Sequence, residues 1–482
     1  MRFRGLLKIG AYVLALVSAT MVFPLGLAFY YRENPGVFLA PMAFSWAAAL
    51  VMNLATRHEP LKISGRDGYL VVALCWVFAS LISAVPFLLS GRFPSVIDAV
   101  FESVSGITTT GATILSDIEG LPVGVGVWRC QLHWLGGLGI IGLTVALMPL
   151  LGIGGFQLIK AETSGPDKTK ITAKIADTAK ILWIIYASLT AAQTVLLMLA
   201  GMSFPDAIAH AFSILGAGGF STRNDSLASF ASTPVNIICT IFMFLAAVNF
   251  SLYYALFRFQ FRSIVNDTEF KAFLVISSLI ILALTLIILP AFGSLGGAFL
   301  AAAFHSASLI STTGLAFTDY SQWHALAQPI LMMMLALGGC SGSAAGGIKI
   351  VRWVVMAKQM RNQFRRFVHP RQVYSISLNK RMGRTDLVYS VAAFFFLYAL
   401  LTAATAVVAS FSGIDLYTSV GAALAIVGNV GLGLGRLGPS GNYAFFHDGA
   451  KLWFCAAMIA GRLELWTVAL LFSPALWRGH AA

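Results

Sequence analysis

Apolar runs of about twenty residues alternate with short polar segments along nearly the whole chain. A helix of about twenty apolar residues is as long as a bilayer's hydrocarbon core is thick, about 30 Å. The pattern therefore predicts an all-α polytopic membrane protein. The ten spanning helices that we expect cover about 8–31, 36–55, 69–90, 127–151, 179–201, 235–259, 271–292, 327–357, 386–410 and 449–472.

Four shorter apolar stretches end on a glycine and agree in character column by column. They read AVFESVSGITTTG (99–111), AIAHAFSILGAGG (207–219), AAFHSASLISTTG (302–314) and SVGAALAIVGNVG (419–431). Self-similarity along a chain is a stronger signal of fold than local propensity. We therefore expect four pseudo-symmetric repeats of helix, half-helix, turn and helix. The half-helices are expected at about 95–107, 204–216, 297–311 and 414–427.

This periodicity also predicts how the chain divides. Two transmembrane helices come first, and the four repeats follow. The expected units are residues 1–67, 68–160 (repeat one), 161–262 (repeat two), 263–366 (repeat three) and 367–482 (repeat four).

Composition and charge agree with a membrane protein. The chain of 482 residues is 58% hydrophobic and only 11% charged, too little charge to cover a soluble globule. With the N-terminus inside, 25 of the 32 Lys and Arg residues lie in segments that face the cytoplasm: 1–8, 57–66, 160–180, 258–271, 349–384 and Arg478. This bias places both termini inside and the four glycine-ended turns in the external half of the membrane. The net charge of +13 then reflects orientation and attraction to anionic lipid, and we expect no nucleic-acid partner.

Neither the first apolar run nor the cysteines indicate processing, a metal site or a redox centre. The first apolar run lacks a small-residue cleavage site and is expected to be a retained helix rather than a signal peptide. No two of the five cysteines form a CxxC spacing, so neither zinc nor a dithiol centre is indicated.

The four glycine-ended turns place non-helical backbone at membrane depth, which requires a physical explanation. Backbone that leaves a helix there must be buried in protein or border water, because lipid cannot satisfy its polar groups. A half-helix that stops in mid-membrane points its carbonyl-rich, negative end inward, which favours a cation. Four such turns around one axis can form rings of carbonyl oxygens that replace an ion's hydration shell. The alternative is that the small residues only allow close helix packing.

The sequence resembles the Trk/Ktr/HKT superfamily of potassium transporters over nearly its whole length, and within it the TrkH subgroup. The resemblance rests on the string Phe-Glu-x-x-Ser-Gly-x-Thr-Thr-Thr-Gly-Ala (101–112), on Gly-Gly-Phe-Ser-Thr (218–222), and on Ser-Thr-Thr-Gly (311–314) and Gly-Asn-Val-Gly (428–431). The segments 338–347 and Gly461-Arg462-Leu463-Glu464 are similar to two further motifs. A departure is Leu432, where the subgroup commonly has proline, which could soften the fourth turn.

This resemblance implies one pore with a potassium filter. The expected ligands are the backbone carbonyls of Thr109, Thr110, Gly111, Ala217, Gly218, Gly219, Thr312, Thr313, Gly314, Asn429, Val430 and Gly431. Glycine at position 111 implies potassium selectivity, with sodium conduction left open. No cofactor is implied apart from the potassium ions in the filter.

A gate is expected within the helix at 327–357. Its segment 338–347 holds five glycines and two serines, and each glycine costs a helix roughly 1 kcal/mol relative to alanine. We therefore expect it to unwind, and the resemblance implies a gating loop across the permeation path. The expected gate residues are Gly338, Gly339, Ser341, Gly342, Ser343, Gly346, Gly347 and Arg462. A small-residue packing seam is the alternative.

Arg462 lies in an apolar run, where a charge needs a partner or water. The resemblance implies a pore-lining barrier, and a structural charge that bridges repeats is the alternative. His210 and His305 occupy the repeat column of Glu102, so we expect anchors of the half-helices rather than metal ligands. His133 is expected to be a satisfied helix histidine. The acids that follow the turns are either a cation-gathering mouth or ordinary loop charges: Asp117, Glu119, Asp225 and Asp319.

Three functional classes remain at this stage: a channel-like potassium pore, a symporter coupled to protons or sodium, and a membrane enzyme. Catalytic strings such as HExxH, GxSxG or a Walker motif do not occur, so an enzyme is not expected. The resemblance further implies a homodimer in the bacterial inner membrane and a cytosolic TrkA-like nucleotide-binding regulatory subunit. The chain itself has no nucleotide-binding string, and its basic inner segments 160–180 and 349–384 are where that subunit would dock.

Overall fold

The structure is a computed structural model of the whole chain. It describes residues 3–57, 65–137, 139, 175–372, 375–379, 381–382, 385–463 and 465–474. The predicted second helix of repeat one, at 127–151, is described only as far as Gly137 and at Gly139.

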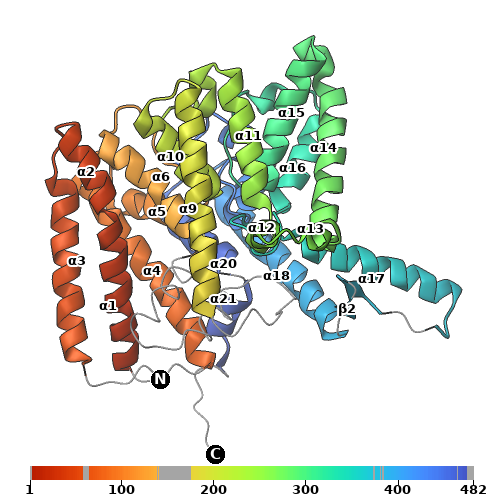
Figure 1. Cartoon of the computed structure of the whole chain (residues 1–482), viewed down its shortest axis with the longest axis horizontal. Helices are drawn as coiled ribbons and strands as arrows, with labels where there is room; N and C mark the ends of the chain where they lie inside the picture. Colours follow the sequence, from red (N-terminus) through yellow and green to blue (C-terminus); the bar gives the residue numbers. More distant parts are fainter. Residues whose placement is uncertain are drawn as a thin grey trace, which may run out of the picture.

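The N-terminal part forms a helical pair at one side of the molecule (Figure 1). Helices α1 (Phe3–Thr20) and α2 (Val22–Tyr30) follow each other so closely that Leu7–Tyr30 makes one candidate membrane span. Helix α3 (Gly36–Ala55) returns alongside. The two predicted helices in front of the repeats are therefore present.

Each of the four segments predicted to be repeats opens with a long apolar helix. These helices are α4 (Gly65–Leu89), α9 (Ile175–Leu199), α14 (Thr268–Phe292) and α18 (Thr385–Ser410). Large apolar side chains remain exposed along them, as at Leu279 and Phe396, which are 61% and 69% exposed. Such surfaces suit lipid rather than water. With the N-terminal pair, the described residues contain six helices long and apolar enough to cross a membrane.

The four half-helices lie within the bundle and have a common design. They are α5 (Val96–Ile107), α10 (Phe204–Leu215), α15 (Leu295–Ile310) and α19 (Leu416–Val427). Each is capped at its N-terminus by a side-chain oxygen that accepts a backbone N–H of the first turn. The capping residues are Ser95, Ser203, Ser294 and Asp415. Such caps satisfy N–H groups that have no partner within the helix. The half-helices therefore begin and end within about two residues of the predicted positions.

The second helix is interrupted in repeats two, three and four, so the single helices predicted at 235–259 and 449–472 are each two helices in the structure. Helix α11 (Thr233–Ala247) meets α12 (Phe250–Phe257) at 95°, and α20 (Asp448–Arg462) meets α21 (Leu465–Leu471) at 117°. Helix α16 (Ala327–Ala336) is separated from α17 (Ile350–Val368) by non-helical chain, as the glycines at 338–347 predict. Helix α6 (Val123–Gly137) is the corresponding helix of repeat one. The break at Val248–Asn249 arises because the Asn249 side chain caps α12.

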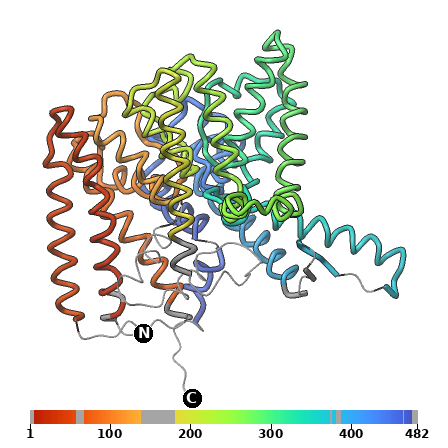
Figure 2. Tube along the Cα trace, viewed as in Figure 1, coloured from red at the N-terminus to blue at the C-terminus, as the bar shows by residue number. Residues whose placement is uncertain are grey.

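Short elements complete the described chain. Helix α13 (Phe261–Val265) precedes α14, and the 3-10 turns η2 (Ser226–Phe230), η3 (Tyr320–Gln322) and η4 (Gly435–Leu437) lie in the segments after three of the turns. Strands β1 (Ser377–Leu378) and β2 (Arg381–Met382) form a small antiparallel hairpin, pairing Ser377 with Met382. Helix α17 projects sideways from the bundle near the start of α14 (Figures 1 and 2).

Candidate functional site

The four glycine-ended triplets, here called turns one to four, have the same backbone conformation. The first residue of each triplet has a positive φ between 53° and 58°, and the last, a glycine, has a φ between 71° and 82°. The residues with positive φ are Thr109 and Gly111, Ala217 and Gly219, Thr312 and Gly314, and Asn429 and Gly431. Non-glycine residues rarely adopt this left-handed region. Four repetitions of the same unusual conformation indicate a common purpose.

The turns meet in a closed ring, in chain order. A Cβ atom built on each final glycine would fall within 2.2 Å of the carbonyl oxygen of the middle residue in the next turn. The pairs are Gly111 with Gly218 (1.9 Å), Gly219 with Thr313 (2.1 Å), Gly314 with Val430 (2.0 Å) and Gly431 with Thr110 (2.2 Å). The fourth turn thus contacts the first. Glycine is required at each position both by φ and by this approach.

Each turn is held by its own half-helix. The N–H of the middle residue donates to the carbonyl five residues earlier: Thr110 to Ser105 (2.9 Å), Gly218 to Ser213 (2.9 Å), Thr313 to Ser308 (2.8 Å) and Val430 to Ala425 (2.9 Å). The carbonyl oxygens of the turns are less well paired. Within the described part of the chain, no N–H or O–H group donates to a carbonyl oxygen of turns one to three, or to the carbonyl oxygen of Asn429. Buried carbonyls are nearly always paired, so these oxygens are available to a ligand.

The fourth turn differs in two hydrogen bonds. The N–H of Leu432, which a proline would lack, donates to the Val430 carbonyl at 3.0 Å. The Tyr443 hydroxyl donates to the Gly431 carbonyl at 2.9 Å. The φ values of the turn nevertheless match those of the other three. Leu432 therefore does not alter the conformation of this turn, although two of its three carbonyls have protein donors.

Buried polar side chains fasten the chain that leaves turns one, two and three. Glu102 and Arg129 form an ion pair of 2.6 Å with both side chains fully buried. Glu102 also accepts from the Ile114 N–H, and Arg129 donates to the Ser221 carbonyl beyond turn two. Both charges of the pair are thus used to position the backbone, which offsets the cost of burying them. Sequence reasoning missed Arg129 as a functional residue.

His210 and His305, which occupy the same repeat column as Glu102, also bond the chain that leaves a turn. His210 contacts the Asp206 carbonyl with Nδ1 and the Ser221 hydroxyl with Nε2. His305 contacts the carbonyls of Ala301 and Thr318. The prediction that they anchor the half-helices is confirmed. No group of three or more His, Cys, Asp or Glu side chains able to hold a metal occurs among the described residues.

His133 on α6 joins two repeats. Its Nδ1 lies 2.7 Å from the Gly106 carbonyl, and its Nε2 lies 3.2 Å from the Phe220 N–H. A carbonyl only accepts and an amide only donates, so Nδ1 carries the hydrogen and the ring is neutral. His133 is a satisfied helix histidine, as predicted. It fixes the first half-helix against the residue that follows turn two.

The segment 338–347, here called the loop, is a folded excursion between α16 and α17. Its two ends come together, since Gly338 N–H donates to Ile348 O and Ile350 N–H donates to Gly339 O. Its outer part lies against the break in repeat two: the Cys340 N–H donates to the Ala247 carbonyl at 2.8 Å. The predicted unwinding is confirmed.

The loop also contacts the turns directly. The Gly346 N–H donates to the hydroxyl of Thr312, the first residue of turn three, at 2.6 Å. A Cβ on Gly346 would lie 2.5 Å from the Gly428 carbonyl and 3.0 Å from the Asn429 Cβ. The loop therefore packs against turns three and four with no room for a larger side chain.

Arg462, at the end of α20, links three segments. Its guanidinium donates to the Ala344 carbonyl of the loop (2.8 Å) and to the carbonyls of Gly136 (2.6 Å) and Gly137 (3.0 Å) at the end of α6. These contacts supply the bridge between repeats that was the alternative prediction. They also place the positive charge beside the loop.

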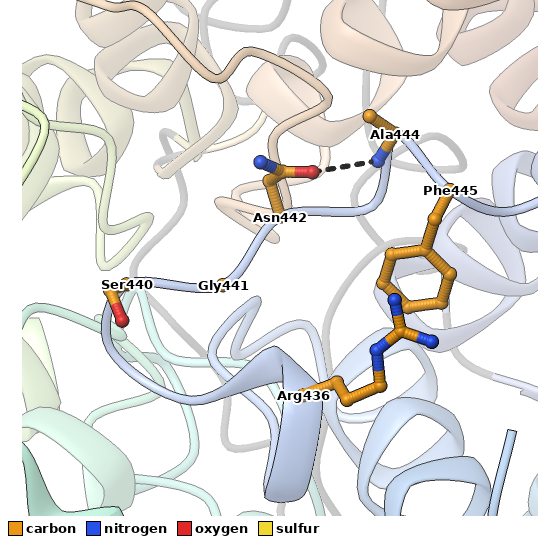
Figure 3. A pocket seen from close by; sticks show the side chains of 6 residues that line it. All are labelled: Arg436, Ser440, Gly441, Asn442, Ala444 and Phe445. Atoms are coloured by element: carbon orange, nitrogen blue, oxygen red, sulfur yellow. Dashed lines mark hydrogen bonds between the residues drawn. The ribbon is translucent and has the colours of Figure 1, made fainter.

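A cavity of about 540 Å³ lies outside this ring, in the chain that follows turn four (Figure 3). Its lining includes Arg436, whose guanidinium lies 4.3 Å from the centre of the Phe445 ring. A cation is an unsuitable lining for a cation site. In the other repeats the corresponding segments carry Asp117, Asp225 and Asp319. Of these, Asp117 and Asp319 accept backbone N–H groups in local turns.

Comparison with known proteins identifies the family. The family model described as "TrkH: Cation transport protein" matches residues 36–478. A Trk system potassium uptake protein TrkH from Vibrio parahaemolyticus is 38% identical, over 99% of this chain and all of that protein. The Trk system potassium uptake protein TrkG of Escherichia coli is 36% identical, over 96% of each chain. The crystal structure of the potassium transporter TrkH from Vibrio parahaemolyticus superposes with a TM-score of 0.89 at 35% identity, over 99% of this chain and all of that one. This chain is therefore a multi-pass membrane protein that belongs to the TrkH family of cation transport proteins, a family of transporters and not of enzymes.

Proposed function

We propose that this protein takes up potassium across the bacterial inner membrane through a channel-like pore with a filter of backbone carbonyls. The observation that carries the proposal is the closed ring of four turns whose buried carbonyls largely lack protein donors. Carbonyl oxygens arranged around an axis replace the hydration shell of potassium. The filter residues are the twelve of turns one to four.

The repeat plan supports the same proposal. Four pseudo-symmetric repeats, divided as at 68–160, 161–262, 263–366 and 367–482, would surround one pore, each contributing a half-helix and a turn. The four half-helices end at Ile107, Leu215, Ile310 and Val427, immediately before the turns. Their partial negative ends would favour a cation at the centre of the ring.

The buried acids favour a pore over a coupled symporter. Asp98, Glu102 and Asp206 are buried, and each lies within 3.0 Å of a cationic partner: Lys451, Arg129 and Arg223. A carboxylate that relays protons or binds a coupling ion has to change partners during transport. These three carboxylates are instead tied to fixed cations and backbone, which suits a structural role.

Regulation completes the proposal. The loop, with Arg462 beside it, is the gate, and a cytosolic TrkA-like nucleotide-binding subunit controls it from the basic inner face. Helix α17 exposes Arg361, Arg365 and Arg366 on that face. The functional unit is a homodimer with one pore per subunit and both termini in the cytoplasm. Recovery of a nucleotide-binding subunit by pull-down from membranes tests the partner.

Potassium flux into proteoliposomes tests the transport mode. The purified full-length chain is expected to conduct potassium down its gradient, with no dependence on an imposed pH or sodium gradient. Flux that requires either gradient would instead establish a symporter. Flux of sodium equal to that of potassium would remove the filter assignment.

A further inference from the structure

A side chain at the start of α14 bonds both the loop and the helix α17 that follows it. Glu269 lies in the first turn of this helix. Its Oε1 atom accepts the Ser341 N–H at 2.7 Å and the Val351 N–H at 3.1 Å. Ser341 lies on the outgoing side of the loop, and Val351 is the second residue of α17, after the chain has returned. One carboxylate oxygen therefore joins the two sides.

The chemistry makes this a strong attachment. The Val351 N–H is one of the first N–H groups of α17, which have no partner within the helix. A carboxylate at a helix N-terminus is stabilised by the helix dipole, and hydrogen bonds to an ionised acceptor are stronger than neutral ones. In the part of the chain that the structure describes, Glu269 is the carboxylate that bonds the loop backbone.

The hairpin β1–β2 bonds the same turn of α14. Asn379 occupies the hairpin's turn, with a positive φ of 49°. Its Nδ2 donates to Asp267 Oδ2 at 2.9 Å, and its Oδ1 accepts the Thr268 N–H at 2.8 Å. Asp267 in turn caps the helix by accepting the Phe270 N–H. The hairpin and the loop thus meet within three consecutive residues, 267–269.

We propose that Glu269 is a positioning residue that fastens the loop against turns three and four, and that the hairpin 377–382 controls this fastening through Asn379. The inference rests on the proposed role of the loop as a gate and adds how the cytoplasmic side reaches it. A displacement of the hairpin moves the first turn of α14, which carries Glu269. The loop backbone then loses its attachment, and the contact from Gly346 to Thr312 loses its support.

Cys340 provides a measure of loop release that is independent of transport. Its side chain lies in the loop and is only 1% exposed. The experiment measures the rate of N-ethylmaleimide alkylation of Cys340 in the full-length protein in liposomes, resolved by peptide mass spectrometry. Cys239 and Cys455, buried in α11 and α20, serve as internal references. Potassium flux is recorded on the same samples.

Glu269→Ala is expected to raise the alkylation rate of Cys340 about tenfold or more, because two charge-assisted hydrogen bonds are lost. Glu33→Ala is the matched control: Glu33 also accepts two backbone N–H groups at a helix start, from Val123 and Gly124, but it does not contact the loop. It should leave Cys340 unchanged. An unchanged Cys340 rate in Glu269→Ala would overturn the proposal, whatever the flux.

If Glu269→Ala does not fold, milder variants test the same proposal. Glu269→Gln keeps an acceptor oxygen without the charge and should give an intermediate rate, and Asn379→Ala should raise the rate about threefold. Asn362→Ala, which removes a hydrogen bond to the Ser375 carbonyl and leaves the Asn379 contacts in place, is the control for Asn379. Equal rates for Asn379→Ala and Asn362→Ala would overturn the role of the hairpin. Faster alkylation of Cys340 with unchanged potassium flux would support the role of Glu269 in holding the loop, and it would overturn the proposal that the loop is the gate.

Discussion

The turns and the loop are both non-helical backbone in the core, in contact with each other, and they are held in different ways. Each turn is held by its own half-helix, through an N–H that donates to a carbonyl five residues earlier, and by the backbone of the next turn. The loop is held by groups from distant parts of the chain: the Ala247 carbonyl, Glu269 and Arg462. The first arrangement forms with the fold. None of the hydrogen bonds that hold the loop is among those that hold the turns to their half-helices, so we expect the loop to be releasable while the turns stay intact.

The largest effect is expected from a change in the turns. Gly111→Ser places a Cβ where the Gly218 carbonyl lies, at a φ of +79° that serine tolerates poorly. Displacement of that carbonyl should lower the preference for potassium over sodium by about tenfold or more. The measurement is the ratio of potassium to sodium flux in proteoliposomes.

The matched control is Gly413→Ser, at a φ of +72° with no atom within 4 Å of the added Cβ. It carries similar backbone strain outside the ring and should keep the parent ratio. If both variants retain the parent's selectivity, turn one does not select the ion.

The second effect concerns the loop. Deletion of residues 342–346 should raise potassium conductance several-fold without changing the preference for potassium, because the turns are held independently. A packing seam predicts instead that the deletion protein misfolds and is not expressed. A deletion protein that reaches the membrane and conducts no faster than the parent argues against the gate.

Arg462 allows its two roles to be separated. Arg462→Ala should raise conductance less than the deletion does, since the loop remains in place. Arg462→Lys keeps the charge, but it lacks the guanidinium fork, in which one nitrogen donates to Ala344 and the other to Gly136 and Gly137. Conductance of the Lys variant close to that of the Ala variant would identify the bridge as the dominant role. Conductance close to the parent would identify the charge.

The smallest effect is expected from the single hydroxyl that joins the two regions. Thr312→Val removes the acceptor of the Gly346 N–H at nearly constant volume, a loss of about 1 kcal/mol or about fivefold in the loop equilibrium. Thr109→Val is the matched control, because Thr109 occupies the same column in turn one and its hydroxyl has no hydrogen-bond partner. Conductance should rise in the first variant only, and an equal rise in both would mean that the contact to the loop is irrelevant.

The sequence predicted what depends on local chemistry. The half-helices, the turns and the unwinding at 338–347 follow from repeat columns and from glycine content, which act within a few residues. The bend after Ala247 was not predicted, because no Gly or Pro marks it, although Asn249 is a good N-cap and could have indicated a new helix start. The contacts of Glu269 and Arg129 could not be predicted, since they join residues 72 and 27 positions apart.

The closed ring has a consequence for the synthesis and membrane insertion of the protein. Turn one can complete its contact with turn four only after Gly431 has been made, 321 residues after Thr110 (431−110). At the usual speed of a ribosome this delay is about 15–60 s. During that time turn one lacks its neighbour in the ring, and Asp98 lacks its ion-pair partner Lys451. We therefore expect the first repeat to need cover from lipid until the last repeat has been made, because backbone that leaves a helix at membrane depth has to be buried in protein or border water.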